Sequence, residues 1–244
     1  FDDFVAWTVE EKLWGLENLS HIPGSVGAAP IQNVGAYGVE VKDVIESVRV
    51  YNIGERKFEV FTGKECQFGY RDSFFKSEAG RQYVVTAVTY RLCRASKPVL
   101  SYKDLHGRFG ECVPSIEEVR QAIIEIRSKK FPDWKKVGTA GSFFKNPVIL
   151  NEQLAELLLE YPQMPHFPAG EGFAKVPLGW VLDKVLNLKG KGTEKVGQYE
   201  GQALVLINKG GASAADIVAY ATTVVDTVQE VTGITVAWEV TRIG

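Results

Sequence analysis

The stretch His21-Ile-Pro-Gly-Ser-Val-Gly-Ala-Ala-Pro-Ile-Gln-Asn-Val-Gly-Ala-Tyr-Gly38, hereafter the glycine loop, decides how the fold is interpreted. Its eighteen residues include four glycines, three alanines and two prolines, without helical or strand periodicity. Glycine permits positive φ and lets a ligand approach the backbone, and proline fixes φ. We therefore expect a rigid surface of small side chains whose free N–H groups could cradle a pyrophosphate. A long solvated loop is the alternative, although the paired alanines, the isoleucine and the valine are better suited to packing under a flat apolar ring.

The composition bounds the class of protein. The 244 residues allow one large or two ordinary domains, and a hydrophobic fraction of 45% allows a sizeable core. The net charge of -2, with both signs mixed along the chain, gives no electrostatic case for binding nucleic acid or a membrane surface. No run of eighteen apolar residues is present, so no membrane span is expected. The three cysteines and three histidines are scattered, which disfavours a disulfide framework, a metal site or a histidine-based triad and fits a reducing cytoplasm.

Periodicity and capping signals predict a mixture of helices and strands without strict alternation, and hence an α+β fold in both halves. Capping boxes at Ser115 with Glu118 and at Ser213 with Asp216 mark two helix starts. A change of character at Ala95-Ser-Lys-Pro98 places a domain boundary there, dividing residues 1–95 from 96–244. The expected helices cover 2–14, 116–129, 152–160, 178–187 and 214–232, and the expected strands cover 44–51, 57–61, 83–92, 202–208 and 234–240, with a loop over 99–105.

Two short motifs carry residues that could perform chemistry. Arg71 lies in Phe68-Gly-Tyr-Arg-Asp-Ser73, where it could pair locally with Asp72 or recognise a carboxylate or phosphate. Ser142 lies in Ala140-Gly-Ser-Phe-Phe-Lys-Asn-Pro147, where it could cap a helix or turn. Two phenylalanines beside a surface cap would be wasted, however, which favours an inward fold of this segment.

Other candidates are weaker when taken singly. Glu239 follows Trp238 in a predicted strand, and alone it would be a solvent-facing glutamate. Asn146 precedes a proline, so it is expected to be extended and could cap or bind. Alone, Tyr102 and Lys130 would be a loop tyrosine and a surface lysine.

Together, the glycine loop from Ile22, the motif 68–73 and the motif 140–147 resemble, in this order, the motifs of the UDP-N-acetylenolpyruvoylglucosamine reductase (MurB) family. The resemblance runs from near residue 13 to Gly244. It implies a vanillyl-alcohol-oxidase-like FAD-binding domain, of which residues 1–95 would be the C-terminal portion. An α+β substrate-binding domain would follow in 96–244.

The resemblance also implies a reaction. NADPH would reduce FAD, and the reduced flavin would pass a hydride to the enolpyruvyl group of a UDP-sugar, giving UDP-N-acetylmuramate for peptidoglycan synthesis. Ser142 would be the proton donor, with Arg71 and Glu239 at the substrate carboxylate, where we hypothesise that Glu239 is protonated. The substrate would further contact Tyr70, Tyr102, Lys130, Asn146 and Gln202. The FAD would be held by Ile22, Pro23, Gly24, Ser25, Gly27, Ala28, Ala29, Pro30, Gln32, Asn33, Gly35 and Ala36.

The start of the chain adds an expectation. The sequence opens on Phe1, almost inside the first predicted helix, whereas the family's FAD domain begins upstream with a glycine-rich segment. We therefore expect an upstream part to be absent and the chain as given to bind FAD poorly. The alternatives are another FAD oxidoreductase of the same fold, or a UDP-sugar- or nucleotide-binding fragment without stable flavin. In each case we expect a cytoplasmic monomer without nucleic-acid partner, membrane insertion or metal.

Overall fold

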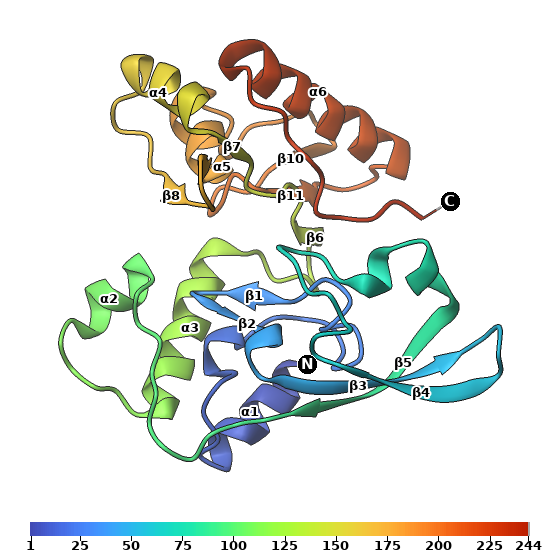
Figure 1. Ribbon diagram of the computed structural model, residues 1–244. Helices are drawn as coiled ribbons and strands as arrows, with labels where there is room; N and C mark the ends of the chain where they lie inside the picture. The colour runs from blue at the N-terminus through green and yellow to red at the C-terminus, as the bar shows by residue number, and fades with distance from the viewer. Residues whose placement is uncertain (244) are drawn as a thin grey trace. The chain divides into compact units, whose positions relative to one another are not determined.

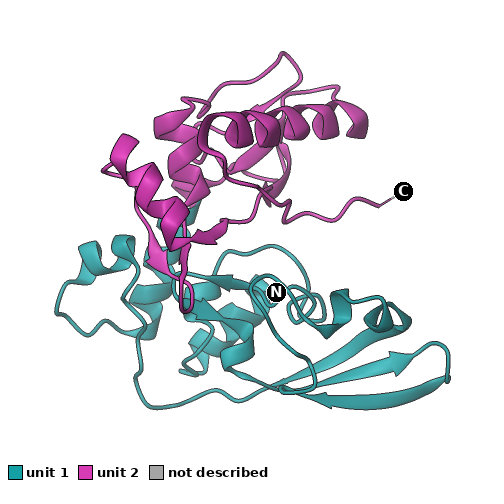
Figure 2. Ribbon diagram, turned by 45° about the horizontal axis from the view of Figure 1, so that its top comes forward, with its two compact units in different colours: residues 1–127 teal, residues 128–244 magenta. Residues whose placement is uncertain are grey.

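The computed structural model describes residues 1–243, which fall into two compact units that divide between residues 127 and 128 (Figure 2). Each unit combines helices with antiparallel sheets, which confirms the expected α+β class. The segment 96–127 belongs to the first compact unit. The predicted division at 95/96, between a flavin domain and a substrate domain, stays a prediction.

The first unit is built on a three-stranded antiparallel sheet in which β3 (Ile45–Asn52) lies between β4 (Lys57–Thr62) and β5 (Tyr83–Tyr90) (Figure 1). All three strands were expected from the alternation of β-branched and aromatic residues. On β3, Val48 and Val50 are fully buried in the core of this unit, as is Cys66 from the turn after β4.

Helix α1 (Asp2–Glu10) is shorter than the predicted 2–14. Lys12 takes a positive φ of 58°, which ends the helix, and Trp14 then pairs through its backbone with Cys93. Helix α2 (Lys103–Phe109) begins inside the expected loop 99–105. Short elements complete the unit: β1 (Gly35–Ala36), β2 (Val39–Glu40) and the 3-10 turns η1 (Glu17–Leu19), η2 (Val41–Asp43), η3 (Phe74–Lys76) and η4 (Ala79–Gln82).

Helix α3 (Ile116–Lys130) begins where its capping box predicts. The Ser115 N–H donates to the Glu118 carboxylate at 2.7 Å, and the Glu118 N–H donates to Ser115 Oγ at 3.3 Å. The expected apolar face is confirmed, because Ile116, Val119 and Ile123 are buried.

The second unit holds two three-stranded antiparallel sheets and three helical segments (Figure 1). The sheets have the orders β10-β11-β6 and β7-β9-β8. Helix α6 begins at its predicted capping box and ends at Gly233, which takes the left-handed φ of 67°. The elements are β6 (Gly138–Ser142), β7 (Val148–Leu150), α4 (Asn151–Glu160), β8 (Phe167–Pro168), β9 (Phe173–Lys175), α5 (Leu178–Trp180) with the π-helical turn η5 (Val181–Val185), β10 (Val196–Gln198), β11 (Val205–Asn208) and α6 (Ala214–Thr232).

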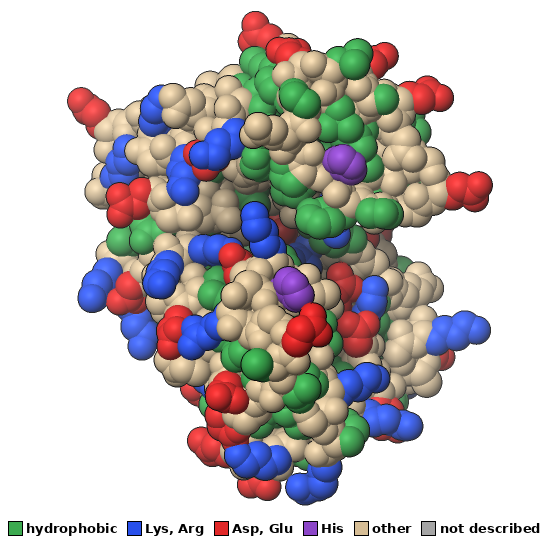
Figure 3. Space-filling view, turned by 90° about the vertical axis from the view of Figure 1, so that its left-hand side faces the viewer, with side chains coloured by type: hydrophobic (Ala, Val, Ile, Leu, Met, Phe, Trp, Pro, Cys, Tyr) green, Lys and Arg blue, Asp and Glu red, His purple; other side chains and the backbone are tan. Residues whose placement is uncertain are grey.

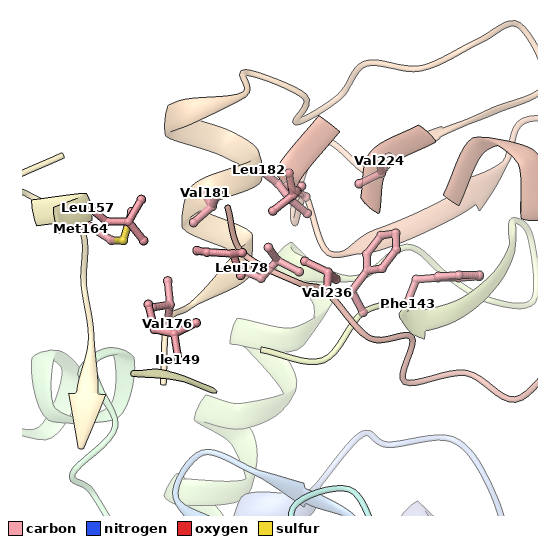
Figure 4. Packing of buried hydrophobic residues seen from close by; sticks show 14 of the residues in the cluster. Phe143, Ile149, Leu157, Met164, Val176, Leu178, Val181, Leu182, Val224 and Val236 are labelled. Carbon is pink, nitrogen blue, oxygen red and sulfur yellow. The ribbon is translucent and has the colours of Figure 1, made fainter. Parts of the chain in front are cut away.

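Residues 234–240 do not form the regular strand that was predicted. Buried and exposed residues do alternate at the start of this segment, as expected. Ile234 and Val236 are buried in the core of the second unit, where Val236 lies beside Phe143 and Leu178 (Figure 4). The segment forms only an isolated antiparallel bridge between Trp238 and Phe144. Its partner is the irregular run after β6, which offers too few paired residues for a strand.

The surface carries mixed charge. The face drawn in Figure 3 carries both basic and acidic side chains. Among residues 1–243, no helix is both long enough and apolar enough to cross a membrane.

Candidate functional site

The glycine loop folds into tight turns followed by a small hairpin. Ser25 caps the first turn, since the Ala28 N–H lies 3.2 Å from both its carbonyl oxygen and its Oγ. The Ala29 N–H bonds back to Val26, and the Val34 N–H bonds back to Ala29 at 3.0 Å. Strands β1 and β2 then pair across Tyr37 and Gly38, both of positive φ, as a two-residue hairpin requires.

This geometry corrects two details of the sequence interpretation. Several of the N–H groups expected to be free are used inside the turns, including those of residues 28, 29, 31, 33 and 34. Ala29 and Val34 are buried in the core of the first unit rather than presented at the surface. The exposed residues of the loop lie mostly near its start and are His21, Pro23, Gly24, Ser25, Ala28 and Gly38.

Three side-chain hydrogen bonds join the glycine loop to the motif 68–73. Ser73 Oγ donates to the Ile31 carbonyl at 2.6 Å. Asn33 Nδ2 donates to the Gly69 carbonyl at 2.9 Å, and Arg71 Nη2 donates to the Gly35 carbonyl at 2.6 Å. Alternate residues of one segment thus bind alternate residues of the other.

Arg71 lies in a tight turn, hereafter the arginine turn, formed by residues 69–72. Gly69 and Asp72 exchange backbone hydrogen bonds of 2.9 and 3.3 Å, which leaves Tyr70 and Arg71 at its tip. Arg71 has a φ of 53°, a left-handed conformation that costs a non-glycine residue about 1–2 kcal/mol. Its guanidinium carbon lies 5.3 Å from the centre of the Tyr70 ring. The Asp72 carboxylate, the partner in the local ion-pair alternative, accepts the Ser73 N–H at 3.0 Å.

Gly35 leaves room for this guanidinium. A Cβ on Gly35 would lie 2.9 Å from Arg71 Nη1 and 2.8 Å from Glu40 Cγ, which is closer than carbon atoms tolerate. The absence of a side chain therefore lets the arginine lie directly over the loop backbone.

Tyr102 contacts the end of the glycine loop and so belongs to the same group. Its ring makes an edge-to-face contact with Tyr37 at 5.0 Å between centroids, and it is 44% exposed. Burial raises the pKa of Tyr37 to about 12, with a hydrogen bond from Arg127 opposing that shift. Arg127 also donates to the His21 carbonyl at 3.0 Å, so it links α3 to the start of the glycine loop.

In the second unit, Ser142 is the last residue of β6 and lies opposite Val205 of β11. It therefore ends a strand and does not begin a helix. Within the described residues, no hydrogen bond engages its hydroxyl group. The Phe143 N–H donates to the Leu204 carbonyl at 2.8 Å, and both Phe143 and Phe144 are buried, which confirms the inward fold of this segment.

Glu239 lies beside Ser142 through the backbone. Its N–H donates to the Phe143 carbonyl at 2.8 Å, and the Lys145 N–H donates to the Ala237 carbonyl at 2.9 Å. The ring of Trp238 contacts Phe143 edge-on at 5.2 Å. The structure thus brings the predicted proton donor and the predicted carboxylate residue to adjacent extended segments.

Two of the predicted substrate-binding residues of this unit, Asn146 and Gln202, lie at the start of α5. Asn146 Oδ1 accepts the Leu178 N–H at 3.0 Å, so this side chain does act as a cap with its oxygen atom. Gln202 Oε1 accepts the Leu204 N–H at 3.4 Å, and it lies 2.7 Å from where a Cβ on Gly179 would stand. Lys130 is the last residue of α3. The carbonyl group of its neighbour Lys129 packs against Gly201.

The candidate residues therefore form two groups, one in each unit. Tyr70, Arg71 and the glycine loop belong to the first, and Ser142, Asn146, Gln202 and Glu239 belong to the second. Sequence interpretation missed Ser73, Glu40 and Gly179, which position these residues. No local signal marks them. The hydrogen-bond partners of Glu40 and Ser73 lie 7 and 42 residues away, and Gly179 matters only because the side chain of Gln202 packs against it.

Comparison with known proteins assigns the chain to a family. Residues 133–243 match the model described as UDP-N-acetylenolpyruvoylglucosamine reductase, C-terminal domain, and residues 1–55 match that of an FAD binding domain. The UDP-N-acetylenolpyruvoylglucosamine reductase of Flavobacterium johnsoniae is 40% identical over 242 residues, which cover 98% of this chain and 72% of that protein. The chain belongs to the UDP-N-acetylenolpyruvoylglucosamine reductase family.

Further relatives agree with this family. The reductase of Bdellovibrio bacteriovorus is 47% identical over 219 residues, which cover 89% of this chain but only 65% of that protein. The crystal structure of UDP-N-acetylenolpyruvylglucosamine reductase from Thermus caldophilus superposes with a TM-score of 0.62, covering 96% of this chain and 67% of that one. At 23% identity, this last likeness shows the fold alone.

Proposed function

We propose that this reductase-family chain serves the NADPH-dependent, FAD-mediated reduction of the enolpyruvyl group of a UDP-sugar to UDP-N-acetylmuramate, for peptidoglycan synthesis in the cytoplasm. The observation that carries the proposal is the set of three hydrogen bonds that join the FAD-loop candidate to the turn bearing Arg71. These bonds link the proposed cofactor loop to the arginine that we propose to bind a carboxylate.

The glycine loop fits an FAD pyrophosphate in its exposed part. The first N–H groups to bond back inside the loop are those of Ala28 and Ala29, so the turn starts like a helix, whose first N–H groups have no partner within the turn. Gly24, at a φ of 127°, has open space where a Cβ would stand. Such a turn start with small residues suits a negatively charged oxygen atom. When bound, FAD would supply the hydride chemistry that no side chain of the chain can provide.

Arg71 would hold the carboxylate of the enolpyruvyl group. Its guanidinium is planar and permanently charged, and it is already oriented by Gly35 and the Tyr70 ring. A fixed donor aimed at a carboxylate stabilises the extra negative charge that this group acquires during hydride addition.

Ser142 would then protonate the carbon atom next to that carboxylate. Hydride addition leaves a strongly basic enolate on the substrate, so a weak acid such as a hydroxyl group suffices if it is well placed. Glu239 would share the carboxylate site in its protonated form, because two carboxylates cannot both remain charged at close range. A protonated-carboxyl infrared band, lost in Glu239→Gln, is the expected signature; its absence with substrate bound would rule out this role.

The UDP part would lie against Tyr102, Lys130, Asn146 and Gln202. Lysine acts on a phosphate as a point charge, and a tyrosine hydroxyl can donate to it. Asn146 and Gln202 present their oxygen atoms to backbone N–H groups, which directs their NH₂ groups elsewhere as donors for the ligand.

The decisive experiment measures the two half-reactions of Ser142→Ala by stopped-flow absorbance of the flavin, in an FAD-loaded chain. Reduction by NADPH needs no proton at the enolpyruvyl carbon, so its rate should stay near normal. Re-oxidation by the UDP-sugar should slow by about 10²–10⁴-fold, which is the usual worth of an acid–base group. Ser142→Cys, which keeps a transferable proton, should recover part of the loss. Equal slowing of both half-reactions would remove Ser142 from the mechanism.

A further inference from the structure

Asn33 has the most connected side chain of the glycine loop. It is 0% exposed, and it makes three hydrogen bonds to two other segments, residues 40–42 and residue 69. Its Nδ2 donates to Glu40 Oε2 at 2.8 Å and to the Gly69 carbonyl at 2.9 Å, while its Oδ1 accepts the Lys42 N–H at 3.2 Å.

These partners leave Asn33 without a hydrogen to offer a ligand. An asparagine amide has two N–H hydrogens, and both are used. The orientation of the amide follows from its partners, because a backbone N–H can only donate and a carbonyl or carboxylate can only accept. The side chain that the sequence assigns to FAD contact therefore serves the protein's own structure.

The side chain of Asn33 fixes the arginine turn through Gly69. The Gly69 carbonyl closes this turn through the Asp72 N–H at 3.3 Å and also accepts from Asn33. Arg71, at the strained tip, reaches back to the carbonyl of Gly35, two residues after Asn33. Asn33, Gly69, Arg71 and Gly35 thus form a closed ring of contacts. A left-handed arginine persists only where its surroundings fix it.

We propose that Asn33 is a positioning residue, which fixes the arginine turn on the glycine loop so that Arg71 takes its position together with the cofactor loop. Ordering of the loop by a cofactor then orders the carboxylate-binding guanidinium. By linkage, a carboxylate ligand on Arg71 favours the cofactor-bound loop to the same extent. The identities of these two ligands rest on the proposed function, whereas the positioning of Arg71 by Asn33 does not.

The chain contains a matched control in Asn52. This side chain is 1% exposed, and its Nδ2 donates to Glu59 Oε1 at 2.8 Å while its Oδ1 accepts the Glu55 N–H at 3.1 Å. Asn33→Asp and Asn52→Asp therefore make the same chemical change, a buried carboxylate facing a glutamate. Only Asn33 contacts the arginine turn.

The test follows exchange of the Arg71 guanidinium protons with solvent by NMR in the cofactor-free chain, with the resonance assigned by its loss in Arg71→Lys. Asn33→Asp should speed this exchange by about tenfold or more, the equivalent of one lost hydrogen bond. Asn52→Asp should leave it unchanged after correction for global stability. Equal exchange at Arg71 in the two variants would overturn the positioning role. If Asn33→Asp does not fold, Asn33→Ala with Asn52→Ala gives the same comparison without a second carboxylate.

A second arm adds FAD. In the wild-type chain FAD should slow Arg71 exchange, and in the Asn33 variant bound FAD should no longer do so. Binding of FAD without any effect on Arg71 exchange in the wild type would overturn the coupling. Because the chain as given is expected to bind FAD poorly, FAD is titrated up to its solubility limit. Failure of FAD to bind even there would count against the cofactor assignment of the proposed function, and the cofactor-free exchange comparison would still decide the role of Asn33.

Discussion

The two groups of candidate residues are held in place by different kinds of bonds. In the first unit, the glycine loop and the arginine turn are joined by the side chains of Ser73, Asn33 and Arg71. In the second unit, the residues around Ser142 and Glu239 are joined by backbone pairing with 204–205 and 143–145. The first group should therefore be sensitive to the identity of a few polar side chains. The second should tolerate such changes and respond in function rather than stability.

The largest expected loss of stability concerns the group in the first unit, where the glycine loop meets the arginine turn. Gly35→Ala would place a Cβ within 3 Å of both Arg71 Nη1 and Glu40 Cγ. We expect a loss of about 1–3 kcal/mol in the free energy of unfolding, as for other over-packed sites. Urea unfolding measures it. Gly27→Ala is the control in the same loop, since its Cβ would make only ordinary contacts at 3.5 Å or more and should cost less. Equal stability of the two variants would show that the loop rearranges to accommodate a side chain at position 35, and would contradict the prediction.

An intermediate effect concerns the group in the second unit, where we expect a substitution to change ligand binding and not stability. Asn146→Asp keeps an oxygen atom for the Leu178 N–H but replaces the NH₂ donor with negative charge. Stability should change by less than about 0.5 kcal/mol, while the Kd for UDP should rise by about 10–100-fold, as expected for a lost charge-assisted hydrogen bond. Calorimetric titration with UDP and urea unfolding separate the two. Normal UDP binding by this variant would show that Asn146 only accepts the Leu178 N–H and does not bind the ligand.

The smallest effect is a pH dependence at the start of the glycine loop. Burial by itself would raise the pKa of Asp2, but the hydrogen bonds from Arg120 and from the His21 N–H outweigh it and lower that pKa below its ordinary value. Because the folded-state pKa is depressed, the stabilisation is present above the unfolded value of about 3.8 and is lost as the pH falls through the folded pKa.

Asp2→Asn should therefore cost about 1 kcal/mol or less at pH 7, given that the pair is partly exposed, and the variant should lose less stability than the wild type on acidification below about pH 4. Urea unfolding at both pH values measures the difference. Asp3→Asn, in the same helical turn but exposed, serves as the control. Identical pH profiles of wild type and Asp2→Asn would exclude this contribution.

The fold was predictable where the signal is local. The capping boxes at Ser115 and Ser213 gave two helix starts, and the alternation in 44–51 and 83–92 gave β3 and β5. Helix α2 was missed because it buries only Leu105, which leaves no periodic apolar face to detect. The strand expected over 234–240 failed because regularity depends on a partner, and its partner is irregular.

The site was predictable as a set of residues but not as a geometry. Arg71 was singled out, yet nothing local shows that its φ is positive or that it lies over Gly35. Asn33 was assigned to the cofactor through the family resemblance, and the sequence does not show that its side-chain amide donates to Glu40 and Gly69. Such roles depend on contacts across 36 residues of chain, which a local pattern cannot contain.

The alternating bonds between 31, 33, 35 and 73, 69, 71 also restrict how these two segments can change in length. The bonded residues are every second one in each segment, so a shift of one position in either segment would bring the wrong residues together. Insertion or deletion of one residue between Ile31 and Gly35 would thus misalign more than one bond at once. The turn at residues 53–56, between β3 and β4, makes none of these three bonds, so extra residues there would not shift the glycine loop against the arginine turn.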